Sequence, residues 1–346
     1  NKAASNNYLD IILIVLFCVG YFMFRIVKTA IKQQSEKSKI SKSILEFNKS
    51  LKEFMLTQHD STPVKILDEI KVKGFTPDTT TFNTMIDTYI CSGKNSFVEN
   101  TLELMGENDC SQDIITYNTL IKGKCREIDG SNSKDEVLEE AFLIQRKIEE
   151  TGLKSNLITW NCLLDCTLKI RNLKKTEELI ENMIRNRCEP DDITYGTLLK
   201  GVRYQRCFSK KLEILDLIKK LVASQPESRV EEKRALISAY FLCRKVYEAT
   251  EIYQELKEED FDQFTLRVLL KGFGEFKKLS NVIEIQERFD FDTYTFSYLL
   301  NALVKCGKAC EAKKTIISND QYSTVNCTIA IKGLSDQGFY DEAYEL

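Results

Sequence analysis

The sequence predicts an all-α fold, a solenoid of about nine stacked helical hairpins with one membrane-spanning helix near its amino terminus. A short phrase (an aromatic residue, then Asn, Thr and two apolar residues) predicts the solenoid. Its Asn recurs every 35 residues, at Asn48, Asn83 and Asn118. The composition agrees, because the 346 residues include only 4 prolines and 14 glycines. A fixed period of this size indicates hairpins that each contact only their neighbours.

The first element is an unbroken apolar run from Ile11 to Phe24, which predicts a membrane helix over residues 9–27. Arg25 can extend its side chain to the interface, so the span reaches about 17 residues, the short end of the range for a membrane helix. The anchor residues are the large apolar side chains of this run: Ile11, Leu13, Leu16, Phe17, Phe22 and Phe24.

Charges flanking the run predict its orientation. Residues 1–8 form a stub with one basic residue, Lys2, whereas residues 28–43 form a basic juxtamembrane helix or linker. The positive-inside rule therefore places the body on the cytosolic, matrix or stromal side. A cleaved signal peptide fits less well, because Asp10 precedes the run and lysines follow it. A buried or interfacial helix is the other alternative.

Residues 44–346 are expected to form the solenoid. Joins such as Pro77-Asp78 and Pro190-Asp191 end one hairpin and begin the next. The predicted repeats are 44–78, 79–113, 114–156, 157–191, 192–229, 230–262, 263–292, 293–323 and a partial ninth, 324–346.

Three repeats depart most from the common length. The third has eight extra residues at Asp129–Glu136, a polar stretch that predicts a loop between its two helices. Thr116 is expected to cap the first of these helices. Repeats seven and eight are short, at 30 and 31 residues, so we expect clipped second helices.

The phrase and the joins resemble the pentatricopeptide repeat family, whose repeats are helical hairpins of this length. The resemblance implies a right-handed solenoid of the P type and a groove that binds single-stranded RNA, one base per repeat. In the family, the residue after the first-helix aromatic and the last residue of the repeat select the base. Carried to repeats one to four, these pairs are Asn48 with Asp78, Asn83 with Asp113, Asn118 with Asn156, and Asn161 with Asp191.

The resemblance also implies a target. In the family, Asn with Asp favours uracil and Asn with Asn favours cytosine or uracil, which gives U-U-(C/U)-U, read 5′ to 3′ along the chain. The chemistry suits the residues, because an Asn amide offers both a donor and an acceptor to a base edge. Later repeats depart from the pattern, with the pairs Gly196/Arg229, Arg234/Asp262, Arg267/Asp292 and Ser297/Ser323.

Two further positions are implied in the same way. Family members sandwich the base with an apolar residue at the second position of the repeat and face phosphates with a basic residue near the end of the first helix. The sandwiching candidates are Leu45, Ile115, Ile158 and Ile193, and later Phe264, Tyr294 and Val325; Thr80 and Glu231 do not fit. The phosphate-facing candidates are Arg126, Lys169 and Lys305.

Net charge counts against strong RNA binding. The chain carries a net charge of −3, but residues 1–53 hold nine basic and four acidic side chains, so the remainder carries −8. A phosphate-binding surface normally shows a basic excess. Any RNA site must therefore be a local stripe on an acidic scaffold.

The sequence predicts neither catalysis nor a cofactor. It has one histidine, His59, and lacks the phosphate-binding, dinucleotide, zinc-protease and nucleophile-elbow motifs. The 12 cysteines include no C-x-x-C pair, although Cys162 and Cys166 share a helical face. We interpret them as small apolar side chains in a reducing compartment rather than as a metal site.

Two functions follow. The first is a membrane-anchored, non-enzymatic protein that binds pyrimidine-rich organellar RNA. The second is a scaffold subunit of an organellar membrane complex, contacting other protein subunits and no RNA. A weaker third is an adaptor that grips a peptide. The predicted location is the mitochondrial inner membrane with the body in the matrix, or a plastid membrane with the body in the stroma.

Overall fold

The computed structural model describes residues 48, 51–53, 55–56, 62–72, 74, 76–225 and 229–346. Every regular element in these residues is helical, and the helices pair into the hairpins of a solenoid, which confirms the all-α solenoid part of the predicted fold class. The chain divides into two compact units, one ending at Gly123 and the other beginning at Lys124.

The predicted membrane helix at 9–27, with its anchor residues, and the linker at 28–43 lie outside the described residues, as do Leu45 and His59. Within the described ranges, no helix combines the length and the apolar character needed to cross a bilayer.

The first unit is held together by an apolar core. Its helices are α2 (Pro63–Val72), α3 (Thr79–Cys91) and α4 (Ser96–Glu107). Phe82, Met85 and Tyr89 of α3 pack with Ile66 of α2 and Met105 of α4, and all five are almost fully buried. Helix α5 (Ile114–Gly130) begins in this unit and ends in the second.

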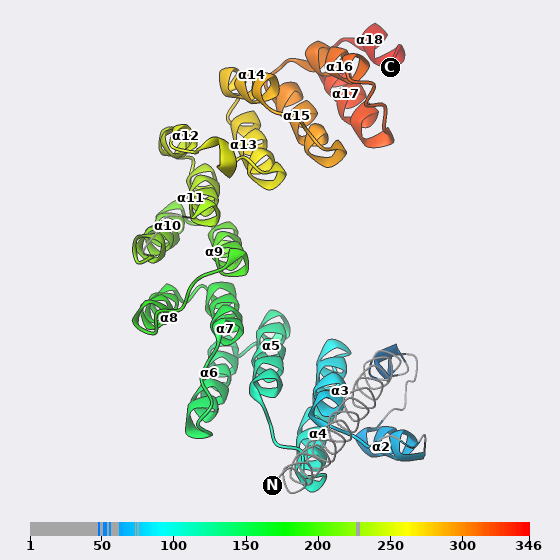
Figure 1. Ribbon diagram of the computed structural model, residues 1–346, viewed down its shortest axis with the longest axis vertical. Helices are drawn as coiled ribbons and strands as arrows, with labels where there is room; N and C mark the ends of the chain where they lie inside the picture. The colour runs from blue at the N-terminus through cyan, green and yellow to red at the C-terminus, as the bar shows by residue number, and fades with distance from the viewer. Residues whose placement is uncertain are drawn as a thin grey trace, which may run out of the picture. The chain divides into compact units, whose positions relative to one another are not determined.

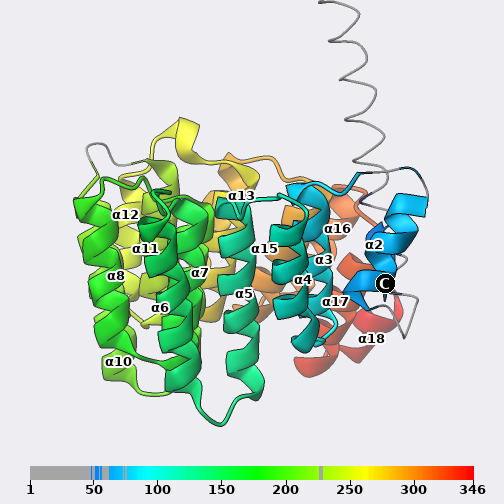
Figure 2. The same ribbon diagram turned by 90° about the horizontal axis from the view of Figure 1, so that it is seen from below.

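The second unit consists of two rows of helices (Figure 1). In one row each first helix packs against the next; it contains α7 (Leu157–Ile170), α9 (Asp192–Tyr204), α11 (Val230–Leu242), α13 (Gln263–Glu275), α15 (Thr293–Lys305) and α17 (Thr324–Asp336). The other row contains α6 (Lys134–Glu150), α8 (Leu173–Arg185), α10 (Phe208–Ala223), α12 (Val246–Gln254), α14 (Leu279–Arg288), α16 (Ala309–Ser318) and α18 (Tyr340–Tyr344). Figure 2 shows these helices side by side, with a short 3₁₀ turn (Glu258–Asp260) before α13.

The last residue of most repeats caps the first helix of the next one. Asp78 caps α3, Asn156 caps α7 and Asp191 caps α9, each by accepting a hydrogen bond from the backbone N–H three residues on. Asp262, Asp292 and Ser323 do the same for α13, α15 and α17. The position that the family resemblance assigns to base selection therefore also has a structural role, which is to cap the next first helix.

The expectation that Thr116 is the capping residue of α5 is wrong, because Thr116 occupies a different position of the capping motif. The capping side chain is Asp113, whose Oδ1 accepts from the Thr116 N–H at 2.8 Å. Thr116 lies three residues into the motif, where its hydroxyl accepts from the Asp113 N–H at 3.2 Å. The pair forms a reciprocal capping box, in which both residue types are favoured.

The loop predicted at Asp129–Glu136 lies in the predicted place but is shorter than expected. Helices α5 and α6 are each 17 residues long, and only residues 131–133 separate them. The extra turns bring Ile128 and Leu138 into the core, and Lys124 forms ion pairs with Glu127 and with Glu140 of α6. Burial of these apolar side chains outweighs the low helix propensity of the segment.

The clipped second helices of repeats seven and eight are confirmed. Helices α14 and α16 each have 10 residues, whereas α8 has 13 and α10 has 16.

The cysteines are not all the reduced, buried side chains that we expected. Cys125 of α5 and Cys166 of α7 form a disulfide, with their Cα atoms 4.9 Å apart. They are 41 residues apart in sequence, and the stacking of first helices brings them together. Cys91 and Cys207 are exposed, which also departs from the expectation.

One glycine marks a close helix contact that can be tested. A Cβ at Gly272 in α13 would lie 2.1–2.5 Å from the ring of Phe241 in α11. Phe241 cannot swing away freely, because it packs edge-on against Phe273 and stacks on Phe276. Gly272→Ala is therefore expected to lower the free energy of unfolding by about 1–3 kcal/mol in urea denaturation, despite the better helix propensity of Ala.

Gly196→Ala is the matched control for this change. Gly196 is also in a first helix, but a Cβ there would meet nothing within 4 Å. We expect it to stabilise the protein by about 0.4–1 kcal/mol. Equal stability of the two variants would show that the α11–α13 contact tolerates a methyl group.

Candidate nucleic-acid interface

In repeat two, the predicted selecting residues are in direct contact. The amide Nδ2 of Asn83, on α3, donates to Oδ1 of Asp113 at 3.1 Å. Its Oδ1 accepts from the hydroxyl of Thr116 at 2.7 Å. Since Asp113 and Thr116 form the cap of α5, the amide is held against the start of the next helix. One N–H and one lone pair of the amide are left for a ligand.

Repeat four repeats this arrangement within the second unit. Nδ2 of Asn161, on α7, donates to Oδ1 of Asp191 at 3.2 Å. The hydroxyl of Thr194 donates to the same carboxylate oxygen at 2.8 Å. Asn161 is only 8% exposed, and no donor among the described residues reaches its buried Oδ1. An unsatisfied buried acceptor of this kind costs about 1–3 kcal/mol.

The other two predicted pairs are placed at equivalent positions. Asn48 and Asn118 are as buried as Asn83 and Asn161. Asp78 caps α3 and Asn156 caps α7, each as part of a capping box with a Thr.

The two clamping carboxylates are ionised at neutral pH. Burial opposes ionisation of Asp113, but hydrogen bonds from the N–H and hydroxyl of Thr116 and from Asn83 outweigh it and lower the pKa of Asp113. The pKa of Asp191 is lowered in the same way: burial again opposes ionisation, and hydrogen bonds from Thr194 and Asn161 outweigh it. An ionised carboxylate accepts from the Asn amide, so it fixes which amide atom faces outward.

The predicted sandwiching residues are exposed apolar side chains. Ile115 is 58% exposed, Ile158 59% and Ile193 66%. Phe264, Tyr294 and Val325 occupy the same position in later repeats and are also exposed. An exposed isoleucine at this position of a first helix indicates a surface available to a flat ligand.

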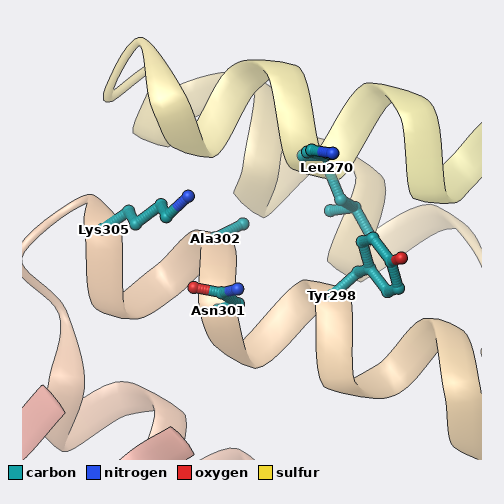
Figure 3. Close-up of a pocket in the computed structure, with 6 residues that line it drawn as sticks. Leu270, Tyr298, Asn301, Ala302 and Lys305 are labelled. Carbon is teal, nitrogen blue, oxygen red and sulfur yellow. The ribbon is translucent and has the colours of Figure 1, made fainter. Parts of the chain in front are cut away.

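The predicted phosphate-facing cations are placed less favourably. Lys169 is 13% exposed in its side chain and pairs with Asp129 and Asp165. Lys305 pairs with Glu275, and Arg126 is exposed. Lys305 lies at one end of a cavity of about 220 Å³ between α13 and α15 (Figure 3), lined also by Leu270, Lys271, Tyr298, Asn301 and Ala302.

The pairs of repeats five to seven differ in kind. Gly196 offers no side chain, and Arg229 donates to the carbonyl of Pro190 at 2.8 Å. The guanidinium of Arg234 lies over the ring of Phe264, and that of Arg267 lies over the ring of Tyr294. The sequence patterns did not predict these contacts. An Arg after the first helical turn, with an aromatic residue at the second position of the next repeat, is the signal that could have found them.

Among the described residues, no three His, Cys, Asp or Glu side chains come together as a metal site. The arrangement can therefore offer hydrogen bonds and apolar contacts, and the residues described supply no metal-ligand cluster.

Family models match three segments of the chain. Residues 65–124 match the pentatricopeptide repeat domain, residues 155–203 the PPR repeat family, and residues 234–261 the PPR repeat.

Curated relatives come from Arabidopsis thaliana. One pentatricopeptide repeat-containing protein is 27% identical over 178 residues, covering 50% of this chain and 30% of the relative. A putative mitochondrial one is 25% identical, covering 60% of this chain and 33% of the relative. The small ribosomal subunit protein mL103 is 23% identical over 42% of this chain and 34% of the relative. The chain thus spans about a third of the length of these proteins.

Among solved structures, pentatricopeptide repeat protein PPR10 from maize aligns with a TM-score of 0.54 and 20% identity, covering 82% of this chain and 40% of that one. PPR10 in complex with an 18-nt psaJ RNA element aligns with a TM-score of 0.50 and 21% identity over 82% of this chain and 45% of that one. This likeness concerns the fold. Pentatricopeptide repeats are therefore recognised at residues 65–124, 155–203 and 234–261, and the fold of the chain resembles that of PPR10.

Proposed function

We propose that this chain binds single-stranded organellar RNA without catalysing a reaction, and that repeats one to four read the bases U-U-(C/U)-U. The observation that carries the proposal is the Asn–Asp clamp of repeats two and four. Each clamp holds an Asn amide against the following helix and leaves hydrogen-bonding capacity for a ligand.

Uracil suits these clamps. Its Watson–Crick edge carries one N–H donor between carbonyl acceptors. The N–H can donate to the oxygen of an Asn amide, and a carbonyl can accept the amide N–H that the carboxylate does not use. The exposed side chains of Ile158 and Ile193 supply apolar contacts for the base faces. PPR10, which has the same fold, was solved in complex with RNA.

The proposed location follows from relatives and from the sequence. Relatives of this chain include proteins named as mitochondrial and one ribosomal subunit protein. We propose that the apolar run at 11–24 tethers the protein to the mitochondrial inner membrane, with the repeats in the matrix; a plastid membrane is the alternative.

Fluorescence anisotropy at a fixed salt concentration tests the RNA proposal. A labelled 16-nucleotide RNA containing U-U-C-U is compared with one in which these four bases are adenines. We expect the first RNA to bind more tightly, and Asn83→Ala with Asn161→Ala to remove at least about tenfold of that affinity, since each base reading is worth about 1–3 kcal/mol. The matched control is Asn100→Ala with Asn182→Ala, on α4 and α8, the second helices of repeats two and four. Equal binding of both RNAs would contradict base reading.

A second candidate function is a scaffold subunit of an organellar membrane complex, contacting other protein subunits. The pairing of Lys169 and Lys305 with acidic residues favours it, because paired cations attract phosphates weakly. Ultraviolet crosslinking in cells separates the two candidates. RNA enriched in U-U-(C/U)-U supports the first, whereas no crosslinked RNA and a stoichiometric membrane complex support the second.

A further inference from the structure

Repeats six and seven have an arginine where repeats one to four have the base-reading asparagine. Arg234 lies on α11 and Arg267 on α13. The Arg234 guanidinium carbon lies 4.5 Å from the ring centroid of Phe264, and that of Arg267 lies 5.2 Å from the ring centroid of Tyr294 and 5.5 Å from that of Phe264. We name Arg234, Phe264, Arg267 and Tyr294 the arginine–aromatic ladder.

The ladder occupies the surface that a base would use in the other repeats. Phe264 and Tyr294 are at the second position of their repeats, which Ile158 and Ile193 occupy in repeats four and five. In the ladder, a guanidinium lies over one face of each ring. A guanidinium has about the thickness of a base, so a base cannot contact the same face at the same time.

The same carboxylates that would clamp an asparagine hold the arginines. Arg234 pairs with Asp262 at 3.3 Å and with Asp192 at 2.8 Å, and its side chain is only 7% exposed. Arg267 pairs with Asp292 at 3.7 Å and donates to the hydroxyl of Thr295 at 3.2 Å. Asp262 and Asp292 are the last residues of repeats six and seven, the counterparts of Asp191 in repeat four.

The chemistry of arginine also excludes the reading used by asparagine. A guanidinium has donors and no acceptor, so it cannot accept the N–H of uracil as an asparagine amide can. The ladder does not attract phosphates either, because its two arginines face three carboxylates, those of Asp192, Asp262 and Asp292.

We propose that Arg234 and Arg267 close the base-reading positions of repeats six and seven by stacking on the adjacent aromatic rings. Since Gly196 leaves repeat five without a reading side chain, the base-reading surface ends at repeat four. This inference rests on the proposed RNA-binding function and adds the residues that set its limit.

The test is a gain of binding. Arg234→Asn with Arg267→Asn recreates the Asn–Asp pair in both repeats. Two RNAs carry the U-U-C-U core, one spacer nucleotide, and then either UU or AA opposite repeats six and seven. The unchanged protein is expected to bind both within about twofold. The double variant is expected to bind the UU probe at least about fivefold more tightly than the AA probe.

Two further variants secure the interpretation. Arg206→Asn with Arg244→Asn is the matched control, because both arginines are exposed and lie between the helices of a hairpin. It should not discriminate between the probes. Arg267→Asn alone replaces the less buried arginine and should create discrimination at the nucleotide opposite repeat seven only. Circular dichroism checks that each variant is folded.

The outcomes distinguish this inference from the proposed function. Discrimination between UU and AA by the unchanged protein overturns the inference, and so does a folded Arg267→Asn variant that binds the core without gaining discrimination. In both cases the reading by repeats one to four stands. If neither the unchanged protein nor any variant binds the U-U-C-U core, the proposed function is wrong and the inference is wrong with it.

Discussion

Replacing Ile158 and Ile193 together with aspartate is expected to weaken RNA binding by at least about tenfold while leaving the thermal unfolding midpoint nearly unchanged. The side chains are 59% and 66% exposed, so their removal opens no cavity. Surface changes of this kind usually alter stability by less than about 0.5 kcal/mol. Burying an isoleucine side chain against a base is worth up to about 1.5–3 kcal/mol, and two new carboxylates repel the phosphates. Anisotropy and a thermal melt measure the two effects.

Leu143→Asp is the matched control for the isoleucine variant. Leu143 is a similarly exposed apolar residue, but it lies on α6 in the other row of helices. It should leave RNA affinity unchanged. Unchanged affinity in the double isoleucine variant would show that this surface does not contact RNA. Loss of a co-purifying protein subunit in that variant, with no RNA bound by either protein, would favour the scaffold candidate.

The sequence predicted the fold well because its repeats carry local signals. The joins that end in Asp78, Asp191 and Asp262 place a capping residue directly before an apolar helix, and α3, α9 and α13 begin at the next residue. Caps depend on residues three apart, so they can be recognised without knowledge of tertiary contacts. Burial of the asparagines follows from the same periodicity.

The errors occur where a distant contact overrides a local preference. The polar stretch at Asp129–Glu136 is helical except at residues 131–133, because Ile128 and Leu138 are buried when α5 and α6 lengthen together. Cys125 and Cys166 are joined by stacking that links residues far apart in sequence. Propensity and spacing describe one segment at a time, so neither result could be predicted from them.

The candidate site was predictable in its positions but not in its contacts. Repeat alignment identifies Asn161 and Asp191 as a pair. It does not reveal that the carboxylate of Asp191 also caps α9, or that Arg234 covers Phe264. Such contacts depend on side-chain direction across two repeats.

Asp191 both caps α9 and contacts Asn161, and this leads to a prediction that separates capping from base reading. Its Oδ1 accepts from the N–H of Thr194, from the hydroxyl of Thr194 and from Asn161. Asp191→Ala removes a cap worth about 0.5–2 kcal/mol and leaves a buried hydroxyl without its acceptor. We expect the free energy of unfolding to fall by about 2 kcal/mol in urea denaturation, together with a loss of RNA affinity.

Asp191→Asn should behave differently, because Asn156 already caps α7 with the same geometry. The Oδ1 of Asn156 accepts from the N–H of Thr159 at 3.0 Å and from its hydroxyl at 3.1 Å. The free energy of unfolding of the Asn variant should therefore fall by less than about 1 kcal/mol. Repeat four would then carry an Asn–Asn pair, as repeat three does. Its preference should relax from uracil towards cytosine at the fourth base. A loss of stability equal to that of the Ala variant would show that the negative charge of Asp191, and not its geometry, maintains the start of α9.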